Sequence, residues 1–159
     1  MSNVLSGSCS IEEQLRIHGS YAANTRGTSM EPLFRTHRDA IVILPVEGKL
    51  KKYDVPLYKA GEGVYVLHRI IGFYEQGYLI RGDNTFVTER VPFSAVIGVL
   101  SEFNRKGKSC SCRDRGYIIY SRVWCFIYPV RYLLFKIRRI LSGIYHTFIK
   151  RDKKKSMEK

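Results

Sequence analysis

Residues 64–80, VYVLHRIIGFYEQGYLI, carry the pattern that decides the fold. β-Branched, aromatic and aliphatic side chains dominate the first part, Val64–Ile71, which predicts a strand. Glu75-Gln76-Gly77 then separates two short apolar segments, an arrangement typical of a β-hairpin. The centre of the chain is therefore predicted to be β structure.

The same kind of pattern extends outward on both sides of this stretch. Further strands are predicted at Ala40–Leu44, Asp54–Tyr58 and Val96–Leu100. Pro56 lacks a backbone N–H, which favours an edge position for the second of these strands. Short strands at this spacing between residues 21 and 103 predict a mainly β domain with coiled, barrel-like sheets.

A short helix is predicted ahead of the β region. Ser10 precedes Ile11-Glu12-Glu13, which is the arrangement of an N-cap followed by acidic residues in the first helical turn. Gly19 is expected to end this helix at about His18. Residues 1–20 are thus a lead-in with one helix.

The last third of the chain has a different pattern. Apolar residues recur at helical spacing from Tyr120 to Phe148, and Pro129 interrupts the series. Many Lys and Arg residues fall between them. The predicted organisation is residues 1–20 as lead-in, residues 21–109 as a β domain and residues 110–159 as a basic amphipathic helical tail.

The charge is unevenly distributed along the chain. The 159 residues include 27 Lys and Arg against 14 Asp and Glu, which gives a net charge of +13. An apolar content of 45% excludes a mostly disordered chain. Residues 1–109 carry a net charge of +3, and residues 110–159 carry +10. Arguments from basicity to a binding partner therefore concern the tail alone.

Three roles are open for the tail, within residues 117–155. Its apolar face can pack on the β domain or lie on an anionic membrane surface. Alternatively, the tail can bind nucleic acid, with its aromatic rings stacked on bases. Because this face is wide and aliphatic, packing or a membrane surface is favoured. Nucleic acid is disfavoured.

The cellular location is inferred from what the patterns lack. No secretory signal peptide is predicted, and no uncharged run approaches the roughly 20 residues that a membrane span needs. The scattered cysteines favour free thiols in a reducing compartment; they are Cys9, Cys110, Cys112 and Cys125. The prediction is a cytoplasmic protein, peripheral at the inner face of a membrane where the tail binds it, with no cofactor or metal.

Three residues of the β region are of the types, serine, histidine and aspartate, that act together in many hydrolases. Ser29 lies ahead of the first predicted strand, His68 follows an apolar run, and Asp83 follows the hairpin. A serine hydroxyl needs a base such as neutral histidine to become a nucleophile, and a carboxylate orients that histidine. Each residue taken alone is more often part of a turn or a packed core, and spacing does not establish contact.

Four segments stand in order along the β region: Ser29-Met30-Glu31-Pro32, Asp39 before a strand, His68-Arg69-Ile70 and Gly82-Asp83-Asn84. Together, over about residues 20–103, they resemble the motifs of the signal peptidase I superfamily, the S24/S26 serine peptidases. The resemblance implies an all-β catalytic core with Ser29 as nucleophile. It makes His68 the general base, as in the archaeal and endoplasmic-reticulum-type branch, and Asp83 the orienting acid. Glu89 lies where that branch has another acidic residue and is a second candidate acid.

The resemblance implies a serine endopeptidase that cleaves a peptide or leader sequence through an acyl-enzyme. Many family members carry a hydroxyl residue two places before the nucleophile, and here that place is Gly27. The oxyanion hole is then expected to use the backbone N–H of Ser29, with Thr28 as a further candidate donor. The alternative is a catalytically weak or inactive β domain that binds peptides or docks at a membrane.

Overall fold

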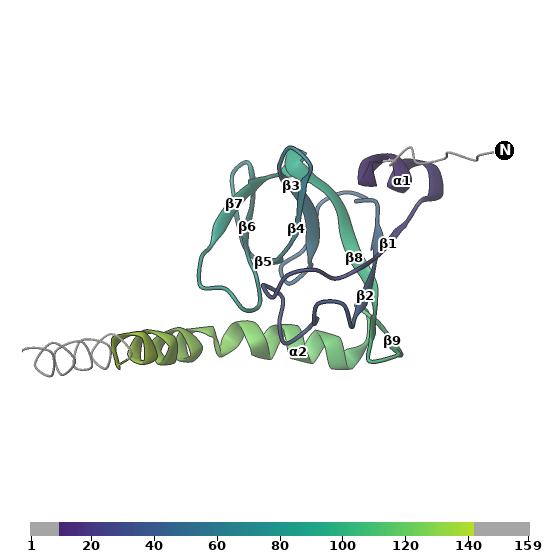
Figure 1. The fold of residues 1–159 in the computed structure, drawn as a ribbon. Helices are drawn as coiled ribbons and strands as arrows, with labels where there is room; N and C mark the ends of the chain where they lie inside the picture. Colours follow the sequence, from purple (N-terminus) through teal and green to yellow (C-terminus); the bar gives the residue numbers. More distant parts are fainter. Residues whose placement is uncertain (1–9, 142–159) are drawn as a thin grey trace, which may run out of the picture. The chain divides into compact units, whose positions relative to one another are not determined.

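The computed structural model describes residues 10–141 and shows a mainly β protein, with 36% strand against 28% helix. The strands form a curled, half-barrel sheet and a smaller three-stranded sheet (Figure 1). The mainly β class predicted from the sequence is confirmed. The chain divides into two compact units, Met1–Arg122 and Val123–Lys159, and each is described by itself.

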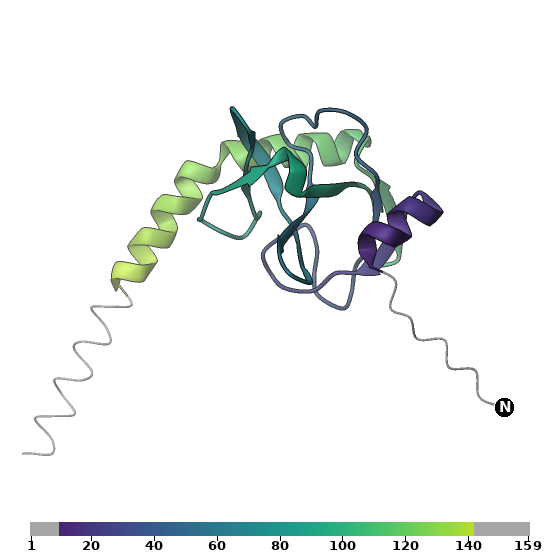
Figure 2. The same cartoon turned by 90° about the horizontal axis from the view of Figure 1, so that it is seen from above.

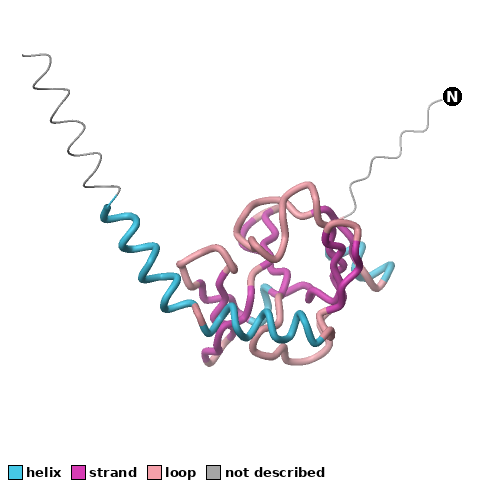
Figure 3. The backbone as a smooth tube through the Cα atoms, turned by 90° about the horizontal axis from the view of Figure 1, so that it is seen from below, coloured by secondary structure: helices cyan, strands magenta, loops and turns pink. Residues whose placement is uncertain are grey.

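The larger sheet forms the curl. Its strands are β1 (Tyr21–Asn24), β2 (Ala40–Leu44), β3 (Pro56–Gly61), β4 (Val64–Leu67), β8 (Val96–Arg105) and β9 (Lys108–Ser111). The order is β1-β2-β8-β3-β4, with β9 paired to β8, and every pair is antiparallel. Strand β8 organises the sheet because one of its edges pairs with β2 and the other with β3 and then β9. The curl can be followed in Figure 3, where the strands are magenta.

The smaller sheet begins at Arg69, which only His68 separates from the end of β4. It contains β5 (Arg69–Tyr74), β6 (Gly77–Arg81) and β7 (Glu89–Pro92) in that order. Leu67 pairs with Leu57 in the larger sheet, whereas Arg69 pairs with Arg81 in the smaller one. The single strand predicted over Val64–Ile71 is therefore wrong, because the chain changes sheets at His68. Both new strands are apolar, so their sequence does not mark the change.

Two apolar clusters fill the domain. One lies against the curled sheet, around Ile43, Leu57 and Phe103, and the other lies at the smaller sheet, around Ile70 and Ile80. Side chains from β3 contribute to both clusters, because Leu57 belongs to the first and Tyr58 to the second. Alternate residues of one strand point to opposite faces. Strand β3 therefore joins the two cores.

The predicted edge position of Pro56 is wrong, because β3 lies between β8 and β4. Pro56 is the first residue of its strand, a position at which a missing N–H is tolerated. The predicted hairpin is confirmed, with Tyr74 paired to Gly77 across Glu75-Gln76. The last predicted strand, Val96–Leu100, is longer than expected and continues to Arg105.

The N-terminal helix α1 (Ile11–His18) confirms its sequence signals. The Ser10 hydroxyl accepts the backbone N–H of Glu13 at 3.2 Å, and Gly19 ends the helix with φ of 67°. Helix α1 lies beside β1 (Figure 2).

Helix α2 (Arg115–Phe126) is followed by a turn at Ile127 and a second helical stretch from residue 128 to residue 141. The expected interruption near Pro129 is thus present. The first unit extends to Arg122, beyond the boundary predicted at residue 109, because β9 and the first turns of α2 belong with the β domain. The tail pattern predicted beyond residue 141, together with Cys9, lies outside the described residues.

A buried ion pair links the smaller sheet to α2. Arg69 is 0% exposed, and its Nε and Nη2 donate to the two carboxylate oxygens of Asp83 at 2.8 and 2.7 Å. Its Nη1 donates to the Tyr53 carbonyl and to the Tyr117 hydroxyl, and the Tyr120 hydroxyl donates to Asp83. Burial opposes the charge of Arg69, but Asp83 outweighs burial and raises the pKa of the guanidinium. The guanidinium thus stays charged, and each of its three nitrogens donates a hydrogen bond.

We expect Asp83→Asn to lower the free energy of unfolding by about 3–5 kcal/mol, because it leaves the guanidinium of Arg69 buried without its counter-ion. Urea denaturation of the full chain measures this loss. The control Glu75→Gln, in the hairpin turn, should change stability by less than about 0.5 kcal/mol. An Asp83→Asn protein as stable as the control would show that the ion pair does not hold the domain together.

Candidate active site

The loop between β1 and β2 carries Ser29 and is fastened to the segment after β6. The Ser29 carbonyl accepts the backbone N–H of Asn84 at 2.7 Å, and the Asn84 side-chain amide donates to the Thr28 carbonyl at 3.2 Å. Met30 also anchors the loop, because its side chain is buried in the apolar core. The nucleophile candidate therefore sits on a fixed main chain.

Asp39 closes the other end of this loop. Its carboxylate accepts bonds from the Arg38 guanidinium, at 2.7 and 2.6 Å, and from the backbone N–H groups of Arg35 and Lys106. The Arg38 hydrogen bond is the main cause that lowers the pKa of Asp39 to about 2. Asp39 thus has a structural role here, holding the loop to the turn after β8.

Gly82 lies close to both His68 and Ser29. A Cβ atom added at Gly82 would lie 2.6 Å from the Ser29 carbonyl oxygen and 3.0 Å from His68 Nε2. A side chain at this position would therefore force the two apart. Glycine here allows the Nε2 edge of the imidazole to approach the main chain of Ser29.

The opposite edge of the imidazole contacts Glu89. His68 Nδ1 lies 3.2 Å from Glu89 Oε1 and 3.3 Å from the Tyr58 hydroxyl, and that hydroxyl donates to Glu89 Oε2 at 2.8 Å. Three elements meet here, because Tyr58 is on β3, Glu89 begins β7 and His68 joins the two sheets. The arrangement orients the ring, and its Nε2 edge lies on the side of Gly82.

The acid partner of His68 thus differs from the sequence-based assignment. Asp83 was expected to orient His68, but its carboxylate is engaged by Arg69 and Tyr120. Glu89, the second candidate, occupies the orienting position instead. The physical reason is that Asp83 points toward the buried arginine at the start of β5, where the guanidinium provides two parallel hydrogen bonds.

The electrostatics of the site favour a neutral imidazole. Burial lowers the pKa of His68 below its ordinary value, and the charges of Glu89 and Asp83 only partly oppose this. Burial, reinforced by the hydrogen bond to Glu89, also raises the pKa of Tyr58, so its hydroxyl stays protonated and donates. A neutral histidine with a free lone pair on Nε2 can accept a proton.

The backbone around Ser29 explains the glycine two places earlier. Gly27 has φ of 81°, a conformation that side chains disfavour, although a Cβ there would meet no atom within 4 Å. Its carbonyl accepts the Thr36 hydroxyl at 2.7 Å. Within residues 10–141 the N–H of Ser29 has no hydrogen-bond acceptor. It is available to a ligand.

A cleft of about 670 Å³ opens beside Ser29. Its walls come from β1 and β4, which are the two ends of the curled sheet, and from the loop that carries Ser29. Core side chains including Met30, Phe34 and Leu57 also line it, and polar and apolar groups contribute about equally to the lining. The cleft therefore offers apolar contacts and two strands beside Ser29.

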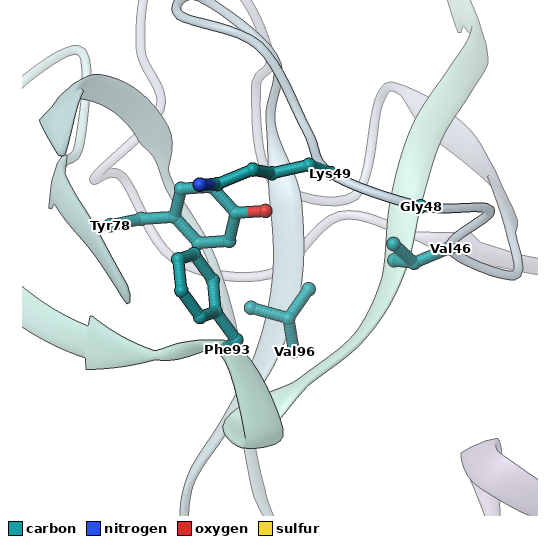
Figure 4. Close-up of a pocket in the computed structure, with 6 residues that line it drawn as sticks. All are labelled: Val46, Gly48, Lys49, Tyr78, Phe93 and Val96. Atoms are coloured by element: carbon teal, nitrogen blue, oxygen red, sulfur yellow. The ribbon is translucent and has the colours of Figure 1, made fainter. Parts of the chain in front are cut away.

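A second hollow of about 380 Å³ lies elsewhere on the domain (Figure 4). It is lined by Val46, Gly48, Lys49, Tyr78, Phe93 and Val96. The Lys49 side chain extends over the rings, with Nζ 5.3 Å from the centre of Phe93. None of the lining residues is a serine, a cysteine, a histidine or an acid, so this hollow lacks the groups of a hydrolytic site.

Among residues 10–141, no group of three or more His, Cys, Asp and Glu side chains is placed to hold a metal ion. Cys110, Cys112 and Cys125 form no disulfide bond within the described residues. Burial raises the pKa of Cys112 to about 11, which keeps its thiol protonated and unreactive.

No protein-family model matches the chain, and no curated protein matches its sequence. The site is therefore argued from its geometry.

The sequence did not point to Tyr58 or to the role of Arg69. Tyr58 lies 31 residues from Glu89 and on a different sheet, so no local pattern could pair them. Arg69 directly follows His68 within the motif, but its burial depends on the sheet change at that point.

We expect Gly82→Ala to destabilise the domain by about 1–3 kcal/mol, because the added methyl group overlaps the Ser29 carbonyl and the His68 ring. The matched control is Gly61→Ala, where a Cβ meets no atom within 4 Å and should cost nothing. Urea denaturation compares the two variants. Equal stability of both would contradict the close approach of Ser29 and His68.

We expect Glu89→Gln to lower the pKa of His68 further, because removing the carboxylate removes an interaction that favours the imidazolium. NMR titration of the histidine rings in the full chain measures this change, with His37 as an internal reference. Glu62→Gln, at an exposed turn, should leave the titration unaltered. A His68 pKa that stays constant or rises in Glu89→Gln would remove Glu89 as its partner.

Proposed function

We propose that this protein is a serine endopeptidase of the signal peptidase I type, whose β domain corresponds to the S24/S26 catalytic core. One observation carries the proposal. His68 is held at Nδ1 by Glu89 and Tyr58, while its Nε2 edge lies across Gly82 from Ser29. An acid at one ring nitrogen of the histidine and a serine on the side of the other is the order in which these groups stand in a serine hydrolase.

The chemistry follows from the roles of these groups. The Ser29 hydroxyl attacks the carbonyl carbon of a peptide bond, and His68 Nε2 takes up the hydroxyl proton. Glu89 stabilises the imidazolium that forms, and Tyr58 keeps the carboxylate in place. The tetrahedral intermediate then breaks its C–N bond, and His68 returns the proton to the departing amine. Water attacks the acyl-serine in the same way and releases the second product.

The oxyanion would be stabilised by the backbone N–H of Ser29, with Thr28 as a further candidate donor. Gly27 supplies no hydroxyl, and one oxyanion donor contributes about 2.7–4 kcal/mol to the transition state. We therefore expect turnover to be slow. The left-handed backbone at Gly27 shows why a hydroxyl residue is not accommodated there without strain.

The cleft suits an extended peptide. Among the strands that the structure describes, β1 and β4 each pair with one neighbour, which leaves one edge of each unpaired, and both line the cleft. A peptide in extended conformation can hydrogen-bond to a free strand edge while its side chains enter apolar pockets. The substrate class is therefore a peptide or leader segment with apolar side chains near the cleaved bond.

A second function rests on the same cleft. A domain that binds peptides without cleaving them would use the strand edges and the apolar lining but not His68. The absence of a hydroxyl at Gly27 favours this alternative. The two functions differ in whether Ser29 is reactive.

We expect a fluorophosphonate probe to label the full chain at Ser29 and to label Ser29→Ala not at all, with the attachment site read by mass spectrometry. His68→Gln should slow labelling by on the order of 100-fold or more, because the general base is removed. Ser94→Ala is the matched control at an exposed serine and should label normally.

Labelling that persists in Ser29→Ala would overturn the assignment of the nucleophile. An unlabelled Ser29 in a folded parent protein would overturn the enzyme, and peptide binding by that protein would then support the binding domain.

A further inference from the structure

The second compact unit presents an uncovered apolar face. Among its described residues, 123–141, six apolar side chains follow one another at alternating spacings of three and four and so lie on one side of the helical turns. They are Val123, Phe126, Val130, Leu133, Ile137 and Ile140. All are exposed, from 43% for Ile137 to 84% for Phe126. Contiguous apolar exposure of this kind marks an interaction surface.

The charge of this stretch has one sign. Residues 123–141 contain four cationic side chains and no acidic one; the cations are Arg131, Lys136, Arg138 and Arg139. At helical spacing, none of the four falls on the apolar side. The face is therefore bordered by positive charge, which is complementary to an anionic surface.

Two aromatic side chains of the same stretch lie against the protein's own cations. The guanidinium of Arg131 lies 3.8 Å from the centre of the Trp124 ring, and Lys136 Nζ lies 4.9 Å from that of Tyr132. Tyr132 also stacks on Tyr128, with ring centres 5.9 Å apart. Rings engaged in this way are poorly placed to stack on bases, which argues against nucleic acid as the partner.

We propose that residues 123–141 bind the surface of an anionic lipid bilayer, with the apolar face at the boundary of headgroups and acyl chains and the cations near lipid phosphates. Within residues 10–141 no helix is long and apolar enough to span a membrane. An amphipathic helix lying in the interface needs only one apolar face and flanking cations. This binding is independent of the reaction proposed for Ser29.

A second copy of the chain fits the same face less well. The spacing of three and four would suit a paired helix. However, two copies would bring four cations each into proximity, with no acid within residues 123–141 to offset them. Like charges along such a pair are destabilising, whereas an anionic bilayer neutralises them.

The test is co-sedimentation of the full chain with vesicles of phosphatidylcholine alone and of phosphatidylcholine mixed with phosphatidylglycerol. We expect binding to the anionic vesicles that weakens with added salt, and little binding to the neutral ones. The variant R138Q/R139Q should bind about fivefold more weakly for each cation removed. Its charge-matched control is K51Q/K52Q in the first unit, which should bind as the parent does.

A second pair of variants isolates the apolar face. L133S/I137S should lose binding, whereas F135S, an exposed residue off that face, should retain it. Equal binding to both kinds of vesicle, or full binding by L133S/I137S, would overturn the proposal. A lipid-independent dimer in sedimentation equilibrium that dissociates in L133S/I137S would overturn it in favour of a second copy. Labelling of Ser29 should be the same in all these variants, so failure here and failure of the enzyme proposal are distinguishable.

Discussion

The ion pair between Arg69 and Asp83 is the interaction on which the arrangement of the β domain depends. A guanidinium that is fully buried must be paired and hydrogen-bonded, and the two carboxylate oxygens and two tyrosine hydroxyls around the pair meet this need. Each partner stands next in sequence to a residue of the candidate site, because His68 precedes Arg69 and Gly82 precedes Asp83. Fixing the pair therefore also fixes the imidazole and the glycine that lies against it. The positions of His68 and Gly82 beside Ser29 therefore depend on an ion pair between the residues that directly follow them.

The two acids near His68 have separate tasks because their surroundings differ. Asp83 is buried and neutralised by an arginine, so it serves the fold. Glu89 is partly exposed at the start of β7 and contacts the imidazole directly, so its charge acts on His68. Tyr58 contacts both members of this second pair and remains protonated. A buried histidine with a lowered pKa and an oriented ring is suited to accept a proton at neutral pH.

The charge of the chain has a different meaning in each unit. In the β domain, cations are matched by acids, as in the pairs at Asp39 and Asp83. Residues 123–141 contain four cationic side chains and no acidic one, and the apolar side chains that they border are exposed among residues 10–141. A single net charge for the whole protein therefore conceals a nearly neutral β domain and a strongly cationic amphipathic segment. The β domain carries the reaction that we propose, and the cationic segment carries the membrane binding that we propose.

Local interactions were determined by the sequence itself. The caps of α1, the hairpin at Glu75-Gln76 and the interruption near Pro129 depend on residues within a few positions of one another, so their signals are legible in the chain. The short motifs likewise pointed to Ser29 and His68 as residues of one candidate site, and both lie beside Gly82 in the structure. Tertiary structure alone decided that the apolar run breaks at His68, because an apolar strand suits either sheet equally well. It alone decided which acid faces the imidazole, since that choice depended on where a distant arginine was buried.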